Sequence, residues 1–137
     1  MHFVDTSFLV ARFNKRDTMH GAALEFIDPL ASSKIPRQRL VLSDYVFDEM
    51  ITGILSRTRN HGVAAQAGLV VRNSRSSEII VVDRPVIEAA WKLFLDRPDK
   101  LWSFTDCTSF VLMQSLGIRT AVTFDENFRQ FGFETLP

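Results

Sequence analysis

The sequence has few of the residues that form disulfides, zinc sites or membrane spans. It contains one cysteine, Cys107, which excludes an intramolecular disulfide and a zinc site built from several cysteines. A single thiol is typical of a reducing compartment, so we expect a cytoplasmic protein. The three histidines, His2, His20 and His61, do not show metal-ligand spacing. Apolar runs stay shorter than a membrane span needs, and we expect no membrane association.

Net charge is also absent, because 16 basic residues balance 16 acidic ones. The chain therefore lacks the global positive field that draws nucleic acid to a protein, although an acidic site can offset a local basic patch. Internal repeats and a glycine-rich phosphate loop are missing too. With 46% hydrophobic and 23% charged residues, the composition is that of a folded domain. We predict a single domain over residues 1–137, long enough for its own core.

Short apolar segments alternate with helical patterns along the chain. Strands are predicted at residues 2–5, 40–43, 78–83 and 119–124, with a short final strand within 131–136. Helices are predicted as a hairpin at 6–32 and then at 44–59, 63–73, 85–95 and 105–116. This alternation is typical of a parallel sheet covered on both faces. We therefore predict an α/β fold, a three-layer α/β/α sandwich with a central, mainly parallel sheet of four to five strands.

The stretch from Leu101 to Phe128 joins an apolar helix to an apolar strand, and an aspartate stands at the start of the helix and at the end of the strand. Asp106 shares a helix face with large apolar side chains. Taken alone, it is also explained as a first-turn acid after an N-cap at Thr105. Asp125 follows the strand, and the carboxyl ends of strands are where α/β sheets bind ligands.

Two more acids are expected at the same edge of the sheet. Asp5 ends the first predicted strand, and Glu49 lies about one turn inside the helix that follows the second. Four carboxylates in one place repel each other unless a cation balances them, and oxygen ligands without histidine or cysteine favour Mg²⁺ or Mn²⁺ over zinc. The natural chemistry of such a site is phosphodiester hydrolysis.

Glu49 has two competitors on its own segment, Asp44 and Asp48. A different helix start would shift either of them into its place. Asp48 projects about 100° away from Glu49 on a helix of 3.6 residues per turn, which favours the surface. We assign the site to Glu49.

Four segments of the chain resemble PIN-domain ribonucleases, and the resemblance extends over nearly the full length. They are VDTS at residues 4–7, SDYVFDEM at 43–50, SFTDCTSF at 103–110 and TFDENF at 123–128.

This resemblance implies a catalytic metal site for Mg²⁺ or Mn²⁺ formed by Asp5, Glu49, Asp106 and Asp125, with Ser7 as a nearby hydroxyl that orients water or phosphate. It implies a metal-dependent endoribonuclease that acts as the toxin of a toxin–antitoxin pair. The expected partners are an RNA substrate, an antitoxin protein and a second copy of the chain in a homodimer.

The side chains that would hold the RNA backbone are less well marked. Arg12, Arg57 and Arg59 are the candidates, since arginine binds phosphate through paired donors.

Two other functions fit the same acids. One is a PIN-like module that has lost catalysis and only binds RNA or an antitoxin. The other is a phosphotransfer domain in which Asp5 itself is phosphorylated. That chemistry requires a lysine late in the chain, and Lys100 is the only lysine beyond Lys92.

Overall fold

A computed structural model describes residues 1–32 and 38–137, and of residues 28–32 the backbone only. It contains one sheet of five parallel strands in the order β3-β2-β1-β4-β5. The strands are β1 (His2–Val4), β2 (Leu40–Ser43), β3 (Ser77–Ile80), β4 (Thr120–Val122) and β5 (Glu134–Leu136). The predicted parallel sheet is confirmed.

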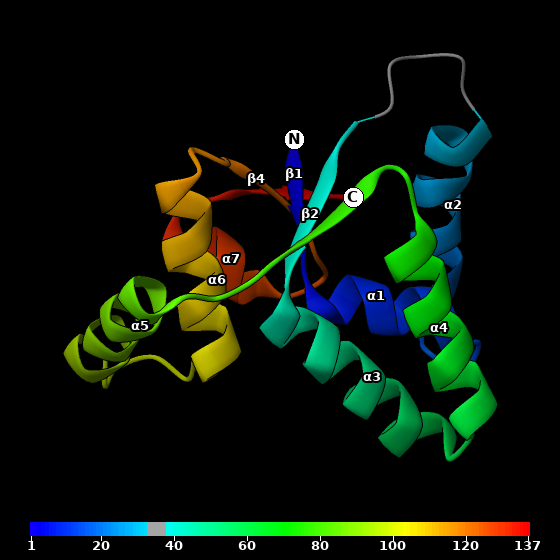
Figure 1. Cartoon of the computed structure of the whole chain (residues 1–137), viewed down its shortest axis with the longest axis horizontal. Coiled ribbons are helices and arrows are strands. Elements are labelled where there is room, and N and C mark those ends of the chain that lie inside the picture. The colour runs from blue at the N-terminus through cyan, green and yellow to red at the C-terminus, as the bar shows by residue number, and fades with distance from the viewer. Residues whose placement is uncertain (33–37) are drawn as a thin grey trace.

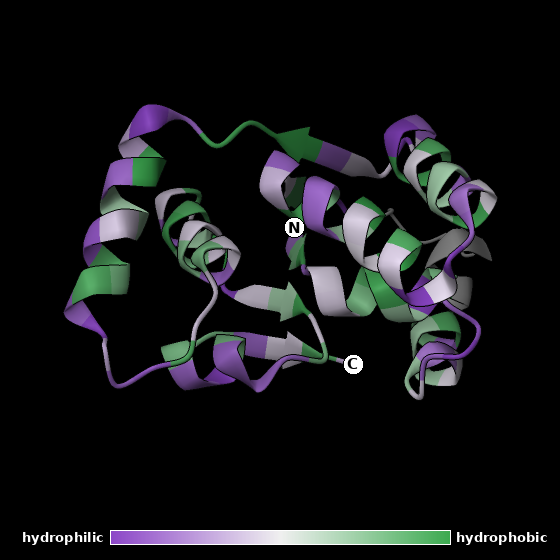
Figure 2. Ribbon diagram, turned by 90° about the horizontal axis from the view of Figure 1, so that it is seen from below, coloured by the Kyte–Doolittle hydropathy of each residue, from purple (hydrophilic) through white to green (hydrophobic). Residues whose placement is uncertain are grey.

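Seven helices cover the two faces of the sheet in the described part of the chain. They are α1 (Thr6–Phe13), α2 (His20–Ser32), α3 (Asp44–Thr58), α4 (His61–Asn73), α5 (Arg84–Asp96), α6 (Phe104–Ser115) and α7 (Glu126–Phe131). Figure 1 shows α1 to α4 on one side of the sheet and α5 to α7 on the other. The view from below in Figure 2 shows the same two groups, and the predicted three-layer sandwich is confirmed.

The central strand β1 places two distant parts of the sequence side by side. It pairs with β2 on one edge and with β4 on the other, so that Phe3 lies between Val41 and Ala121. The pairing continues past the strand, because the amide of Asp5 donates to the carbonyl of Val122 at 3.0 Å. All five strands point the same way, so the loops that follow β1, β2 and β4 meet at one edge of the sheet.

An aromatic cluster fixes α6 and α7 against the sheet. The ring of Phe110 lies 5.0 Å from that of Phe128 and 4.4 Å from that of Phe131, and Phe128 stacks on Phe3 of β1 at 6.3 Å. Phe110 and Phe128 are fully buried. Because burying an aromatic side chain is among the largest single gains in a core, this cluster anchors both helices against the sheet.

Several predicted boundaries were wrong by a few residues. The helix α6 begins at Phe104 and its N-cap is Ser103, not Thr105. The third strand ends at Ile80 instead of Asp83, and the Asp83 side chain caps α5 by accepting from the amide of Val86. The first strand stops at Val4, because Asp5 is already the N-cap of α1.

The short helix α7 was not predicted. Residues 126–131 form one and a half turns, with Asp125 as N-cap and Gly132 in the left-handed conformation at the C-cap. Such a short segment carries little periodic signal. In the described residues, no helix combines the length and apolarity that crossing a membrane requires.

Candidate active site

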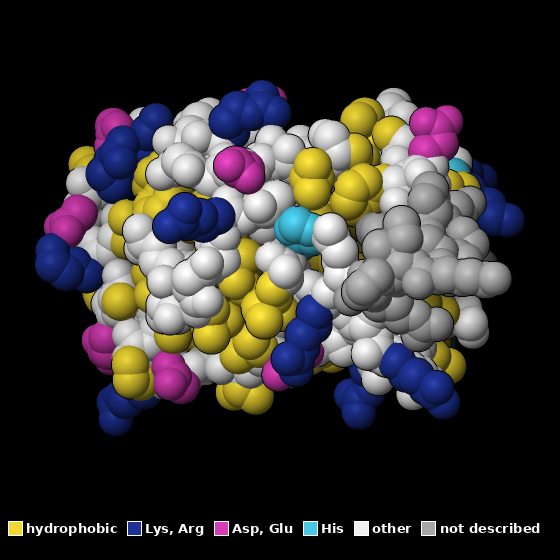
Figure 3. Space-filling view, turned by 90° about the horizontal axis from the view of Figure 1, so that it is seen from above, with side chains coloured by type: hydrophobic (Ala, Val, Ile, Leu, Met, Phe, Trp, Pro, Cys, Tyr) yellow, Lys and Arg dark blue, Asp and Glu magenta, His cyan; other side chains and the backbone are white. Residues whose placement is uncertain are grey.

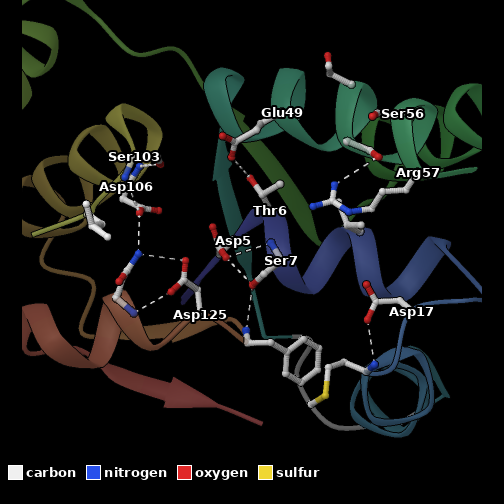
Figure 4. A pocket seen from close by; sticks show the side chains of 17 residues that line it. Asp5, Thr6, Ser7, Asp17, Glu49, Ser56, Arg57, Ser103, Asp106 and Asp125 are labelled. Atoms are coloured by element: carbon white, nitrogen blue, oxygen red, sulfur yellow. Dashed lines mark hydrogen bonds between the residues drawn. The ribbon is translucent and has the colours of Figure 1, made fainter.

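A cleft of about 870 Å³ opens at the carboxyl edge of the sheet. The predicted residues Asp5, Ser7, Glu49, Asp106 and Asp125 all line it. Figure 4 shows that they come from different elements: α1 and its N-cap, α3, α6 and the loop before α7. The structure therefore brings together all five predicted side chains, which lie up to 120 residues apart in the sequence.

Asp5 is the most buried acid of the cleft, with 4% of its surface exposed. Its Oδ2 accepts three hydrogen bonds, from the Ser7 amide at 3.0 Å, the Ser7 hydroxyl at 2.6 Å and the Thr123 hydroxyl at 2.9 Å. The first of these is an N-cap bond, so the start of α1 orients the carboxylate. Ser7 Oγ in turn accepts from the amide of Phe124 at 3.0 Å, which ties α1 to the end of β4.

Asp106 and Asp125 are joined by one amide. The Asn127 Nδ2 donates to Asp106 Oδ2 at 3.0 Å and to Asp125 Oδ2 at 3.3 Å. Asp106 also closes a capping box with Ser103, since each side chain binds the other's backbone amide. Asp106 thus caps α6 while it faces the cleft, so the cap interpretation does not exclude the site interpretation.

Glu49 is held from the opposite wall. The Thr6 hydroxyl of α1 donates to Glu49 Oε2 at 2.7 Å, and both residues line the cleft. The competitors Asp44 and Asp48 line a separate cavity of about 320 Å³. Asp44 also accepts from the amide of Val82, where it supports the chain after β3. The geometry favours Glu49.

Burial and mutual repulsion raise the pKa of two of these acids. Burial raises the pKa of Asp5 above its ordinary value, and its three hydrogen bonds only partly offset this. The pKa of Asp106 is raised to about 6, first by burial and then by the nearby charges of Asp5 and Asp125. Among the described residues, no ion pair relieves either group.

The donor set suits a hard divalent cation. The cleft offers carboxylate, amide and hydroxyl oxygens, and none of its described lining residues is histidine or cysteine. The acids surround the opening without converging fully, since the described residues include no group of three or more acidic, histidine or cysteine side chains already arranged to hold a metal. This suits Mg²⁺, which binds through one or two carboxylates and fills its other positions with water and substrate phosphate.

Sequence reasoning missed the polar side chains that support the acids: Thr6, Ser103, Thr123 and Asn127. All four lie inside the quoted motifs, and this position was the only signal for them. Thr123 and Ser103 bind the acids from the preceding loop residues, which no helical or strand period marks.

The three arginine candidates have different surroundings. Arg57 lines the cleft. Arg12 stacks over the Phe13 ring at 5.0 Å, and Arg59 occupies the left-handed C-cap of α3. Neither Arg12 nor Arg59 is among the described lining residues of the cleft.

Lys100, the lysine that a phosphotransfer domain would need, is also outside the described lining of the cleft. Its Nζ donates to Gln130 and lies 5.8 Å from the Trp102 ring. The phosphotransfer hypothesis therefore lacks its lysine at the predicted site.

Comparisons with known proteins agree with the predicted family. Residues 2–134 match the PIN domain family. The chain is 36% identical over 133 residues to the 23S rRNA-specific endonuclease VapC20 of Mycobacterium tuberculosis, which covers 97% of this chain and 95% of that protein.

Two solved structures are similar to this one. The crystal structure of M. tuberculosis VapC20, described as a sarcin–ricin loop cleaving toxin, superposes with a TM-score of 0.83 at 34% identity, and covers 97% of this chain and 96% of that one. VapBC2 from Rickettsia felis, bound to a DNA fragment from its promoter, has a TM-score of 0.66 at 17% identity, with 98% and 96% covered. The second likeness concerns the fold alone.

Proposed function

The chain belongs to the PIN-domain family, and we propose that it is a toxin-type endoribonuclease that hydrolyses a phosphodiester bond of 23S rRNA in the cleft that its four carboxylates line. The observation that carries this proposal is the convergence of Asp5, Glu49, Asp106 and Asp125 on one cleft. Its substrate class follows from the relative that is 36% identical over 97% of the chain and acts on that RNA.

We propose that Asp5, Glu49, Asp106 and Asp125 hold Mg²⁺ or Mn²⁺. When bound, such an ion activates water and stabilises the leaving oxygen in phosphodiester hydrolysis. The burial that raises the pKa of Asp5, and the burial and repulsion that raise the pKa of Asp106, support a cation at this place, because a nearby positive charge favours both ionised forms.

The other polar residues of the cleft keep the carboxylates in place. Ser7 donates its one hydroxyl proton to Asp5 and accepts from the Phe124 amide, so we assign it a positioning role through Asp5. Thr6 orients Glu49, and Asn127 keeps Asp106 and Asp125 together against their repulsion. Residues of this kind contribute to metal affinity nearly as much as the ligands themselves.

The proposed partners follow from the toxin type. An antitoxin protein would bind the chain and block the cleft. A second copy would pack on the exposed aromatic face of α5, where Trp91, Phe94 and Leu95 are 50%, 42% and 58% exposed. Figure 1 shows α5 at the outer edge of the molecule, away from the sheet. The place of action would be the cytoplasm, where ribosomes are.

The test is cleavage of ribosomes and of a synthetic sarcin–ricin stem–loop by the purified chain, with Mg²⁺ or Mn²⁺ and with EDTA. We expect metal-dependent cutting at one position, reduced at least about 100-fold in Asp5→Asn. Asp48→Asn, an exposed acid outside the cleft, is the matched control and should retain activity. RNA that stays intact at high protein concentration with both metals would refute the activity and leave the binding-module alternative.

A further inference from the structure

The described lining of the cleft carries more acidic than basic side chains, and Arg57 is its one cationic residue. Five acids line it, the four proposed ligands and Asp17. Among the described lining residues, Arg57 is the only arginine or lysine. RNA brings a negative charge at each phosphate, so a cleft of this composition needs a cation on the side chains that receive the backbone. Figure 3 shows the molecule from above, where the basic and acidic side chains of the described residues are interspersed.

Arg57 is seated over a glycine. Its Nη1 lies 2.8 Å from the position that a Cβ on Gly53 would take, too close for a side chain there unless the guanidinium moves. The same Nη1 donates to the Gly53 carbonyl at 3.4 Å. Figure 4 shows the Arg57 side chain extending from α3 into the cleft, toward α1. Among the described residues, the guanidinium makes this one hydrogen bond and no ion pair, so most of its five donors are unused by them.

We propose that Gly53 and Arg57 form a phosphate clamp, in which the side-chain-free position seats the guanidinium and its free donors bind an RNA phosphate. The clamp deepens the proposed function and rests on it. It is defined by these two residues. The hydroxyls of Thr52 and Ser56, which line the same wall of α3, lie beside it and can donate to the same backbone.

The clamp holds a phosphate other than the one that is cut. Arg57 follows Glu49 by eight residues on the same helix, but its guanidinium folds back to Gly53, which follows Glu49 by four residues, or about 6 Å along the axis at 1.5 Å per residue. The guanidinium therefore lies about one helical turn from Glu49, which assigns it to a neighbouring phosphate. Arg57 therefore contributes to substrate binding and KM, and kcat depends on the acids.

The clamp is tested with three variants, Arg57→Ala, Gly53→Ala and the double variant, and with Arg72→Ala as the control at an exposed arginine on α4. RNA binding is measured against salt in an Asp5→Asn background, and cleavage in the otherwise unaltered chain. We expect Arg57→Ala to weaken binding about tenfold and to lower the salt slope by about 0.7 to 0.9, the contribution of one phosphate contact. KM should rise and kcat should change less than twofold.

Gly53→Ala separates the clamp from a purely structural role. Alanine favours a helix over glycine, so Tm should stay equal or rise. The new methyl displaces the guanidinium, so binding should fall about threefold in the unaltered chain, and not at all when Arg57 is already alanine.

Three outcomes count against the clamp. The first is a salt dependence of RNA binding that is the same for Arg57→Ala and Arg72→Ala. The second is additive losses of RNA binding for Arg57→Ala and Gly53→Ala. The third is that the Asp5→Asn chain binds no RNA at any salt concentration. RNA that binds through the clamp but is never cut by the unaltered chain would support the clamp and refute the proposed activity, so the two failures are distinguishable.

Discussion

Thr6 donates its hydroxyl to Glu49 across 2.7 Å, although the two residues lie 43 positions apart. The bond joins the first turn of α1 to α3 at the mouth of the cleft. It distinguishes one acid from its neighbours on the same helix, since neither Asp44 nor Asp48 lines this cleft among the described residues.

Removing that hydroxyl should weaken metal binding. Thr6→Val keeps the side-chain shape but leaves Glu49 without its donor, and we expect the metal concentration for half-maximal activity to rise about tenfold. Thr120→Val, the same substitution on β4 and outside the cleft, is the control. Activity should be titrated with Mn²⁺ for both variants. Equal metal requirements for Thr6→Val and the unaltered chain would show that Thr6 does not position Glu49.

The choice of Glu49 is tested by two isosteric changes. Glu49→Gln removes a charge inside the cleft, whereas Asp48→Asn removes one at an exposed position. We expect kcat/KM to fall at least about 100-fold in the first and less than twofold in the second. Cleavage rates at saturating Mg²⁺ measure both. Similar losses would refute the assignment.

The side-chain amide of Asn127 should support activity by offsetting the repulsion between the charges of Asp106 and Asp125. Asn127→Ala removes the donor that Asp106 and Asp125 share, and Asn127→Asp replaces it with a further negative charge. We expect activity to fall about tenfold in the first and further in the second, unless Mn²⁺ is raised. Circular dichroism should show folded protein in both. If Asn127→Asp retains full activity at low metal concentration, the bridge has no role.

Stability of the metal-free protein should fall as the pH rises from about 4 to about 6. The native Asp106 carboxyl has a pKa of about 6 against an ordinary value of 3.8, so between these values the native state binds more protons than the unfolded state. Stability then decreases with rising pH, by on the order of 2 kcal/mol.

Urea unfolding in EDTA at several pH values measures this loss, and Asp106→Asn should reduce it. Added Mn²⁺ should stabilise the protein more at pH 7.5 than at pH 5, because metal and protons compete for the same oxygens. A metal-free stability that rises over this range would contradict the raised pKa of Asp106.

The exposed aromatic face of α5 predicts self-association. Trp91 stacks on Phe94 at 5.8 Å and packs edge-on against Phe104, so the face is already ordered. Trp91→Glu should convert a dimer to a monomer at micromolar concentration, as measured by sedimentation velocity, because it places a charge in an apolar contact. Leu69→Glu, at a side chain of similar exposure on α4, should leave the mass unchanged. A monomeric unaltered chain would refute the dimer.

The fold and the place of the acids were predictable because parallel strands all end at the same edge of a sheet. Apolar runs near Val4 and Val122 had to be sheet, and once both strands were parallel, Asp5 and Asp125 had to lie at the same edge. Helical projection and the family resemblance together then favoured Glu49 over Asp44 and Asp48.

The supporting residues were not predictable from pattern, because they act through single hydrogen bonds across elements. The role of Thr123 depends on its own hydroxyl, which reaches Asp5 from the residue after β4, 118 positions away in the sequence. The arrangement of Gly53 and Arg57 depends on how a long side chain folds back along its own helix. Neither leaves a periodic signal in the sequence.

The position of β1 between β2 and β4 has a consequence for the time at which the protein becomes active. Asp5 is made more than a hundred residues before the strand that completes its surroundings and the helix that carries Asn127. A nascent chain still attached to a ribosome cannot close the cleft until β4 and α7 have emerged. If the chain cuts ribosomal RNA as proposed, the ribosome that makes it meets no closed cleft before that point.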